Sequence, residues 1–226
     1  MEWWQKAELY SALQNEVTGF TFLTQEIEGE NVVLRGIWPV YGQSELIESY
    51  SIKIVLPKDY PIGVPKIYEL EGKIPRIPDR HINYDGSACI FSPPERWEKW
   101  PIGSGIDTLL DGPVKDYFFS QAYFERTGKW PFGEWAHGDA GVLQYYIDRL
   151  KVLSLKELME LVLLSQYSSP SRQWRCPCGS QKRYRDCHWV YMKPLVAALP
   201  KDEWDYLAKL LQEIKKLPPK KTPFKS

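Results

Sequence analysis

Residues 56–91 read LPKDYPIGVPKIYELEGKIPRIPDRHINYDGSACIF, a stretch rich in proline. A β-prone segment at residues 66–72 gives way to a long stretch without helical or strand periodicity. From Ile74 to about Gly105, prolines 75, 78, 93, 94 and 101 prevent any sustained helix or central strand. An irregular stretch of this length inside a compact domain is usually functional. Because it contains His81, Asn83 and Cys89, we expect a functional loop here.

The residues before this loop predict one helix followed by strands. Apolar residues between Glu2 and Val17 recur at spacings of three and four, which is typical of an amphipathic helix. Residues 20–40 predict two strands joined by a turn at residues 28–31, residues 46–57 predict a third, and KIYELEG predicts a fourth. A helix followed by a run of strands indicates an α+β protein with an antiparallel meander.

The residues after the loop predict helices and a small second domain. Helical patterns cover Ile106–Phe119, about Gly141–Ser165 and about Asp202–Leu217. The polar segment SQYSSPSRQW, residues 165–174, is typical of a linker. We therefore predict one domain over residues 1–165 and a second over 166–226, which ends in a helix and a basic, solvated tail.

Composition and cysteine placement narrow the class of protein. The chain has 226 residues, 43% of them hydrophobic, and 29 Lys+Arg against 29 Asp+Glu give zero net charge. Zero net charge argues against nucleic acid or a membrane as partner. Three cysteines lie within residues 176–187 and Cys89 stands alone, which does not suit a disulfide framework. With no charged leader and no long apolar run, we expect a soluble protein of the reducing cytoplasm.

Cys89 is the first candidate catalytic residue. It follows an Asp85-Gly86 turn signal and small residues, which would leave its sulfur open to a partner. A lone cysteine is more often a buried apolar side chain, but here the loop is irregular and Asn83 offers an amide donor. A thiolate is a good nucleophile and a good leaving group, so Cys89 can form a thioester. An alternative is a cysteine protease with His81 or His137 as the base.

Residues 56–91 as a whole resemble the core signature of ubiquitin-conjugating enzymes. The matching motifs are a Tyr-Pro-x-x-x-Pro turn at residues 60–65, the tripeptide His81-Ile82-Asn83 where the family has His-Pro-Asn, the thioester position at Cys89, and a downstream Trp97 or Trp100. The resemblance covers about residues 1–150. It implies the ubiquitin-conjugating fold: an N-terminal helix, a four-stranded antiparallel meander, an irregular active-site loop and C-terminal helices.

The resemblance also implies an activity and partners. Cys89 would accept a ubiquitin-like C terminus from an activating enzyme and pass it to the lysine amine of a target protein. Asn83 would donate a hydrogen bond to the oxyanion or to its own loop, and His81 would brace the loop. Ile82 and the short spacing from Asn83 to Cys89 depart from the eukaryotic pattern.

The segment GKWPFGEWAHGDAGVLQYY, residues 128–146, resembles bacterial relatives of the same family. Those relatives occur in ubiquitin-like and anti-phage operons of the CBASS type. The resemblance implies that the modifier is a ubiquitin-like protein or a CD-NTase-type nucleotidyltransferase. His137 lies in this segment and is a further candidate catalytic residue.

A second cluster predicts a structural zinc site. Cys176, Cys178, Cys187 and His188 supply the four nitrogen and sulfur ligands that tetrahedral zinc takes. Residues 174–189 also resemble the SEC-C motif, which implies a closed zinc module that docks proteins. Its basic residues are Arg175, Lys182, Arg183 and Arg185. A non-catalytic adaptor that uses both domains for protein binding is therefore the alternative to an enzyme.

Overall fold

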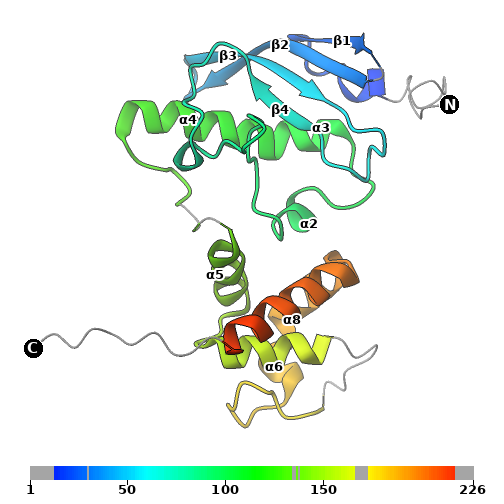
Figure 1. The fold of residues 1–226 in the computed structure, drawn as a ribbon, viewed down its shortest axis with the longest axis vertical. Helices are drawn as coiled ribbons and strands as arrows, with labels where there is room; N and C mark the ends of the chain where they lie inside the picture. The colour runs from blue at the N-terminus through cyan, green and yellow to red at the C-terminus, as the bar shows by residue number, and fades with distance from the viewer. Residues whose placement is uncertain (1–12, 30, 134–135, 137, 166–172, 217–226) are drawn as a thin grey trace, which may run out of the picture. The chain divides into compact units, whose positions relative to one another are not determined.

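The computed structural model describes residues 13–29, 31–133, 136, 138–165 and 173–216. The chain divides into two compact units, residues 1–134 and residues 135–226 (Figure 1). Most of the predicted N-terminal helix lies outside the described residues, although residues 13–16 are helical. The predicted domain boundary at residues 165–166 stays a prediction.

The first unit is built on a four-stranded antiparallel sheet. Its strands are β1 (Leu23–Glu28), β2 (Asn31–Tyr41), β3 (Leu46–Val55) and β4 (Lys66–Glu69), in the spatial order β1-β2-β3-β4. Leu34 pairs with Ile54, which in turn pairs with Ile67, and all three side chains are buried. The predicted meander is confirmed, because alternation along each strand sends one set of side chains into the core.

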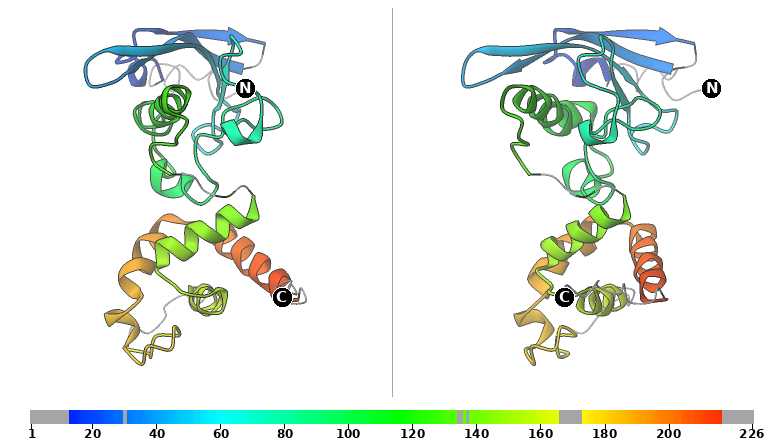
Figure 2. Two further views of the ribbon diagram at one scale, coloured as in Figure 1. Left: turned by 90° about the vertical axis from the view of Figure 1, so that its left-hand side faces the viewer. Right: turned by 60° about the vertical axis from the view of Figure 1, so that its left-hand side comes forward.

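Helical segments cover one face of this sheet. The short helix α3 (Ile106–Leu109) continues through a π-helical turn, η3 (Leu110–Val114), into α4 (Lys115–Thr127), which crosses the sheet (Figures 1 and 2). Phe118 of α4 packs between Trp38 of β2 and Tyr50 of β3, with ring centroids 6.0 Å and 5.0 Å apart. These aromatic contacts place α4 against the core of the sheet.

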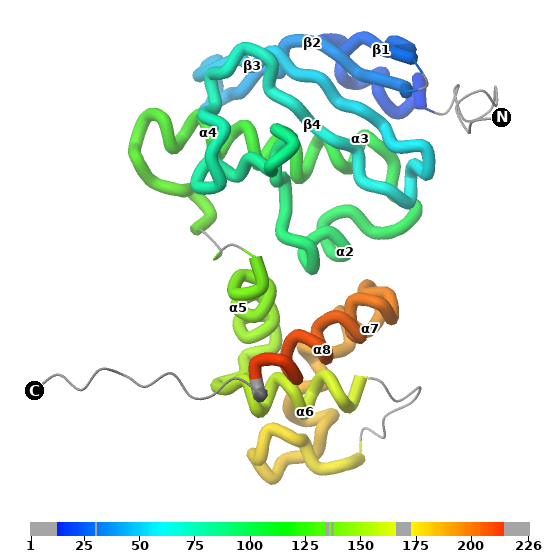
Figure 3. Tube along the Cα trace, viewed as in Figure 1, coloured from blue at the N-terminus to red at the C-terminus, as the bar shows by residue number. Residues whose placement is uncertain are grey.

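The proline-rich stretch is irregular, as its composition predicts. Between β4 and α3 it contains only two short helical turns within the described residues, η2 (Pro78–Arg80) and α2 (Arg96–Lys99), and Figure 3 traces its path. Trp100 is fully buried and its indole nitrogen donates a hydrogen bond of 2.9 Å to the Gly105 carbonyl. The Trp100 side chain therefore helps to fix the chain after α2 to the core.

The second unit consists of helices around a short irregular segment. It contains α5 (Asp139–Leu150), α6 (Leu155–Ser165), η4 (Tyr184–Asp186), α7 (Trp189–Ala198) and α8 (Lys201–Lys216). Helix α6 packs on α8, and α5 contacts both α6 and α7. The continuous helical pattern predicted over residues 141–165 is two helices, because Lys151 ends α5 in a left-handed conformation with φ of 57° and the Ser154 hydroxyl, just before α6, accepts a hydrogen bond from the Glu157 amide.

Both units together make the protein a mixed α+β protein with a four-stranded antiparallel sheet, as the sequence predicts. Within the described residues, no helix has the length and apolar character that crossing a bilayer requires.

Candidate thiol site and metal centre

Cys89 lies on the second arm of a small hairpin whose first arm carries His81 and Asn83. The main-chain amide of Cys89 donates to the His81 carbonyl at 2.8 Å, and the amide of Asn83 donates to the Ser87 carbonyl at 2.8 Å. Between them Ile82 pairs antiparallel with Ala88. The loop thus places the segment His81–Asn83 directly beside the segment Ser87–Cys89.

The hairpin turns at Asp85-Gly86, where the sequence predicts a turn. The Gly86 amide donates to the Asn83 carbonyl at 2.9 Å, and Gly86 has φ of 82°, a conformation that L side chains disfavour. Glycine at this position lets the chain reverse within four residues and return to Cys89.

Polar contacts attach the hairpin to the sheet edge. The Ala88 amide donates to the Ile67 carbonyl of β4 at 2.7 Å, and the ammonium of Lys66 lies 2.7 Å from the Asp85 carboxylate. Asp85 also accepts hydrogen bonds from the amide and hydroxyl of Ser87 at 3.0 Å and 2.6 Å. The hydrogen bonds from Lys66 and then Ser87 hold the pKa of Asp85 well below its usual range, so this carboxylate is charged at neutral pH.

The side chains of Asn83 and His81 contact nearby residues of the first unit. The side-chain amide of Asn83 donates to the Ser87 hydroxyl at 3.1 Å, so its contact in the structure is with its own loop. His81 is left-handed, with φ of 52°, and its ring packs on Trp130 with centroids 4.7 Å apart. The unusual backbone of His81 redirects the chain from η2 into the hairpin.

A buried polar cluster behind the hairpin escaped the sequence analysis. Arg80, next to His81, donates from Nε and Nη2 to the Gln121 side-chain oxygen of α4 at 3.0 Å and 2.8 Å. Gln121 returns a hydrogen bond from Nε2 to the Arg80 carbonyl at 2.8 Å, and Glu125 forms a salt bridge with the Arg80 guanidinium. Gln121 is fully buried, so these hydrogen bonds tie the loop to α4 in a water-poor environment. Gln121 lies just past the helical pattern predicted over residues 106–119, and its apolar neighbours Phe119 and Ala122 are the sequence signal that could have pointed to it.

The thiol of Cys89 is half-buried and protonated at neutral pH. It donates to the Phe91 carbonyl at 3.6 Å. Burial raises the pKa of Cys89, and the negative charge of Glu95 raises it further. Nearby, burial raises the pKa of Tyr117, the Arg80 charge opposes this rise, and a Cys89 thiolate would add to it. The Cys89 thiol therefore acts as a nucleophile only after it loses its proton.

The structure brings Cys89, His81 and Asn83 together through the hairpin. His137, the fourth candidate catalytic residue, lies outside the described residues.

The second unit brings the four predicted metal ligands into one cluster. Ligand atoms of Cys176, Cys178, Cys187 and His188 all lie within 4.8 Å of one another. The Nδ1 atom of His188 is 3.2 Å from the Cys176 sulfur and 3.3 Å from the Cys187 sulfur, and the sulfurs of Cys178 and Cys187 are 3.6 Å apart. A tetrahedral zinc ion with bonds of about 2.0–2.3 Å needs ligand atoms separated by roughly 3.5 Å, so the donor set fits zinc.

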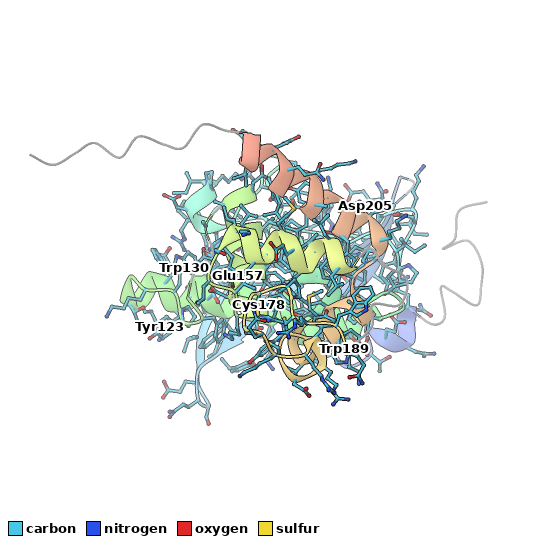
Figure 4. The ribbon with its side chains drawn as sticks, turned by 90° about the horizontal axis from the view of Figure 1, so that it is seen from below. Tyr123, Trp130, Glu157, Cys178, Trp189 and Asp205 are labelled. Atoms are coloured by element: carbon cyan, nitrogen blue, oxygen red, sulfur yellow. The ribbon has the colours of Figure 1, made fainter. Side chains whose placement is uncertain are left out.

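The surrounding backbone orients these ligands. The Cys176 amide donates to the Lys182 carbonyl at 2.8 Å, and Gly179, with φ of 79°, turns the chain between them. His188 is buried, which lowers its pKa, and its ring hydrogen-bonds the backbone of Lys151 at the end of α5. In a metal-binding histidine, a hydrogen bond from the ring nitrogen that does not bind the metal fixes the orientation of the ring. In Figure 4, Cys178 lies in the segment before η4 and Trp189 lies at the start of α7.

Comparison with known proteins identifies the metal cluster only. The family model for the SEC-C motif matches residues 175–189, which include all four ligands. Searches of the curated proteins and of the solved structures gave no match. The SEC-C motif and the Cys3His cluster together support a zinc module at this position of the chain.

Proposed function

We propose that the first unit has a ubiquitin-conjugating-like fold and that the protein is a transferase that carries an acyl group as a thioester on Cys89. The observation that carries the proposal is the hairpin, which holds the Cys89 amide on the His81 carbonyl and sets Asn83 opposite Ser87. A half-buried thiol on a fixed loop at the edge of a four-stranded meander suits a residue that must be loaded and unloaded by partner proteins.

The proposed chemistry is two acyl transfers. In the first, the Cys89 sulfur loses its proton and attacks the C-terminal carbonyl carbon of the modifier, which is held as a thioester on the activating enzyme. The thiolate of the activating enzyme leaves. In the second, a target amine attacks the same carbonyl carbon, the Cys89 thiolate leaves, and the amine nitrogen loses a proton as the amide forms.

Two features of the thiol's surroundings bear on these steps. The raised pKa of Cys89 makes its thiolate a good nucleophile once formed and a poorer leaving group, because basicity and nucleophilicity rise together. Asn83 would stabilise the oxyanion if its amide left Ser87 and turned to the carbonyl, and removal of such a donor costs about 2.7–4 kcal/mol of barrier.

The raised pKa gives no support to the protease alternative. A protease cysteine is activated by a neighbouring base that lowers its pKa, whereas burial and Glu95 shift the Cys89 pKa upward.

The second unit would recruit a partner. Its proposed zinc module carries exposed basic residues, Arg175, Lys182, Arg183 and Arg185, on the loop that a bound zinc ion would hold together, which suits an acidic protein surface. We place the activity in the bacterial cytoplasm, in anti-phage defence, with an activating enzyme, a ubiquitin-like protein or nucleotidyltransferase, and a target lysine as partners.

The test is a charging assay. The protein is mixed with ATP, an activating enzyme and a modifier of the ubiquitin-like or nucleotidyltransferase class, and is then run on gels with and without reducing agent. We expect an adduct that thiols remove and that Cys89→Ala abolishes, while the control Ser120→Ala, which removes a hydroxyl bonded only to its own helix, retains it. An adduct that persists in Cys89→Ala would disprove the thioester role, and no adduct with either protein would favour the adaptor.

A further inference from the structure

The first unit contains a cavity of about 330 Å³ that the proposed transfer chemistry does not use. It lies where three segments meet: the residues just before β1, the end of β2, and the start of α4. A cavity of this volume is at the lower end of the range for small-molecule sites. The lining residues that carry the argument are Phe20, Phe22, Trp38, Asp111, Asp116 and Phe119.

Aromatic rings form the walls of the cavity. The rings of Phe20 and Trp38 are close to parallel, at 20° with centroids 6.2 Å apart, and Phe22 meets both edge-on. Phe119 of α4 lines the cavity as well. The faces of aromatic rings carry partial negative charge, so a wall of this kind attracts cations as well as apolar groups.

Two carboxylates lie at the same cavity. Asp111 of η3 and Asp116 of α4 both line it and both are exposed to solvent. Among the described residues, neither carboxylate forms a salt bridge, although Lys115 lines the cavity too. Two carboxylates and one ammonium give the lining of the cavity a net negative charge.

Aromatic faces and unpaired carboxylates together select for one kind of ligand. An anion would be repelled by both features, and a neutral apolar ligand would gain nothing from the carboxylates. We propose that this cavity is a binding site for a small organic cation of the substituted-ammonium class, with the alkyl groups against Phe20, Phe22 and Trp38 and the charge toward Asp111 and Asp116. The site is separate from the hairpin of Cys89 and does not depend on the transferase proposal.

The test compares choline with 3,3-dimethyl-1-butanol, which has the same shape without the charge. Each is titrated into the isotope-labelled full-length protein, and NMR follows the Trp38 indole N–H and the Gly19 amide. We expect saturable shifts with choline and at least about 5-fold weaker binding of the neutral compound.

The variants separate charge recognition from simple filling of an apolar cavity. Asp111→Asn with Asp116→Asn should weaken choline binding about 5-fold and leave the neutral compound unaffected, while Asp202→Asn on α8 should change neither. Both aspartates are exposed, so their replacement leaves the core intact. Equal affinities for the two compounds, an unchanged affinity in the double variant, or no saturable shift would each overturn the proposal.

Discussion

The main-chain amide of Cys89 donates a hydrogen bond of 2.8 Å to the carbonyl oxygen of His81. This bond closes the hairpin that carries both residues. The position of the thiol therefore depends on the turn at Gly86 and on the contacts that hold His81 in place. The buried pair of Arg80 and Gln121 holds the chain next to His81 in place, because the Gln121 side chain forms hydrogen bonds with both the guanidinium and the carbonyl of Arg80.

Replacement of Gly86 by alanine should destabilise the first unit by about 1 kcal/mol, because a Cβ is disfavoured at a φ of 82°. Nothing crowds the added carbon closely, so the cost is that of the backbone conformation. Urea unfolding monitored by NMR signals of the first unit measures it. Gly112→Ala is the control: it lies in a helical turn without a positive φ, and should be neutral or stabilising. Equal effects of the two changes would refute this account of the turn.

Gln121→Leu should destabilise the first unit by about 1.5–3 kcal/mol, because it removes hydrogen bonds to a buried charged group and to a buried carbonyl. The neighbouring Ser120→Ala removes only a hydroxyl bonded to the Asp116 carbonyl on the same helix, and should stay within about 0.5 kcal/mol of the wild type. Chemical denaturation compares the two. If Gln121→Leu proved as mild as Ser120→Ala, the Arg80 cluster would not hold the loop.

Alkylation of Cys89 by iodoacetamide should rise with pH and reach half its limiting rate above about pH 8.5, the ordinary thiol pKa. The pKa is raised, so the unreactive protonated thiol persists to higher pH. Glu95→Gln removes the nearby negative charge and should lower this midpoint, although burial keeps it above the ordinary value. Peptide mass spectrometry follows Cys89 alone, and Glu98→Gln on α2 is the control, with no shift expected. A midpoint below the ordinary thiol pKa would contradict the burial argument.

The purified protein should contain about one equivalent of zinc, since three thiolates and one imidazole complete a closed tetrahedral site. Cys176→Ser together with Cys187→Ser should lose the metal and reduce the helical circular dichroism of the second unit, because the ligand His188 is the residue immediately before α7. Elemental analysis measures the zinc content. Cys89→Ser provides the matched control and should keep the full equivalent; retention of zinc by the double variant would exclude the proposed ligand set.

The sequence predicted the parts of the structure that depend on residues close together along the chain. Alternating residues such as Ile52 and Ile54 identified β3, and the spacing from Cys176 to His188 identified the metal ligands. Helix α7 was missed because Pro194 lies inside it, and proline normally argues against a helix interior. The break between α5 and α6 depends on the left-handed Lys151, which no periodicity reveals.

The buried polar cluster shows why the rest of the candidate site could not be predicted. Arg80 and Gln121 lie 41 positions apart, and their contact exists only after α4 crosses the sheet. The sequence places Gln121 between the apolar residues Phe119 and Ala122 but does not identify the residue that it contacts. The same holds for the cavity at Trp38, whose walls come from three separate segments.

The most direct test of the proposed transfer uses Cys89→Lys in the charging assay. An amine at residue 89 would attack the carbonyl carbon of the activated modifier and form an amide, which resists thiols and survives proteolysis for mass spectrometry. We predict a modifier remnant on residue 89 and no such amide at the neighbouring lysines Lys66 and Lys99. A remnant at those lysines with none at residue 89, while the wild-type protein still forms its adduct, would show that Cys89 is not the acceptor.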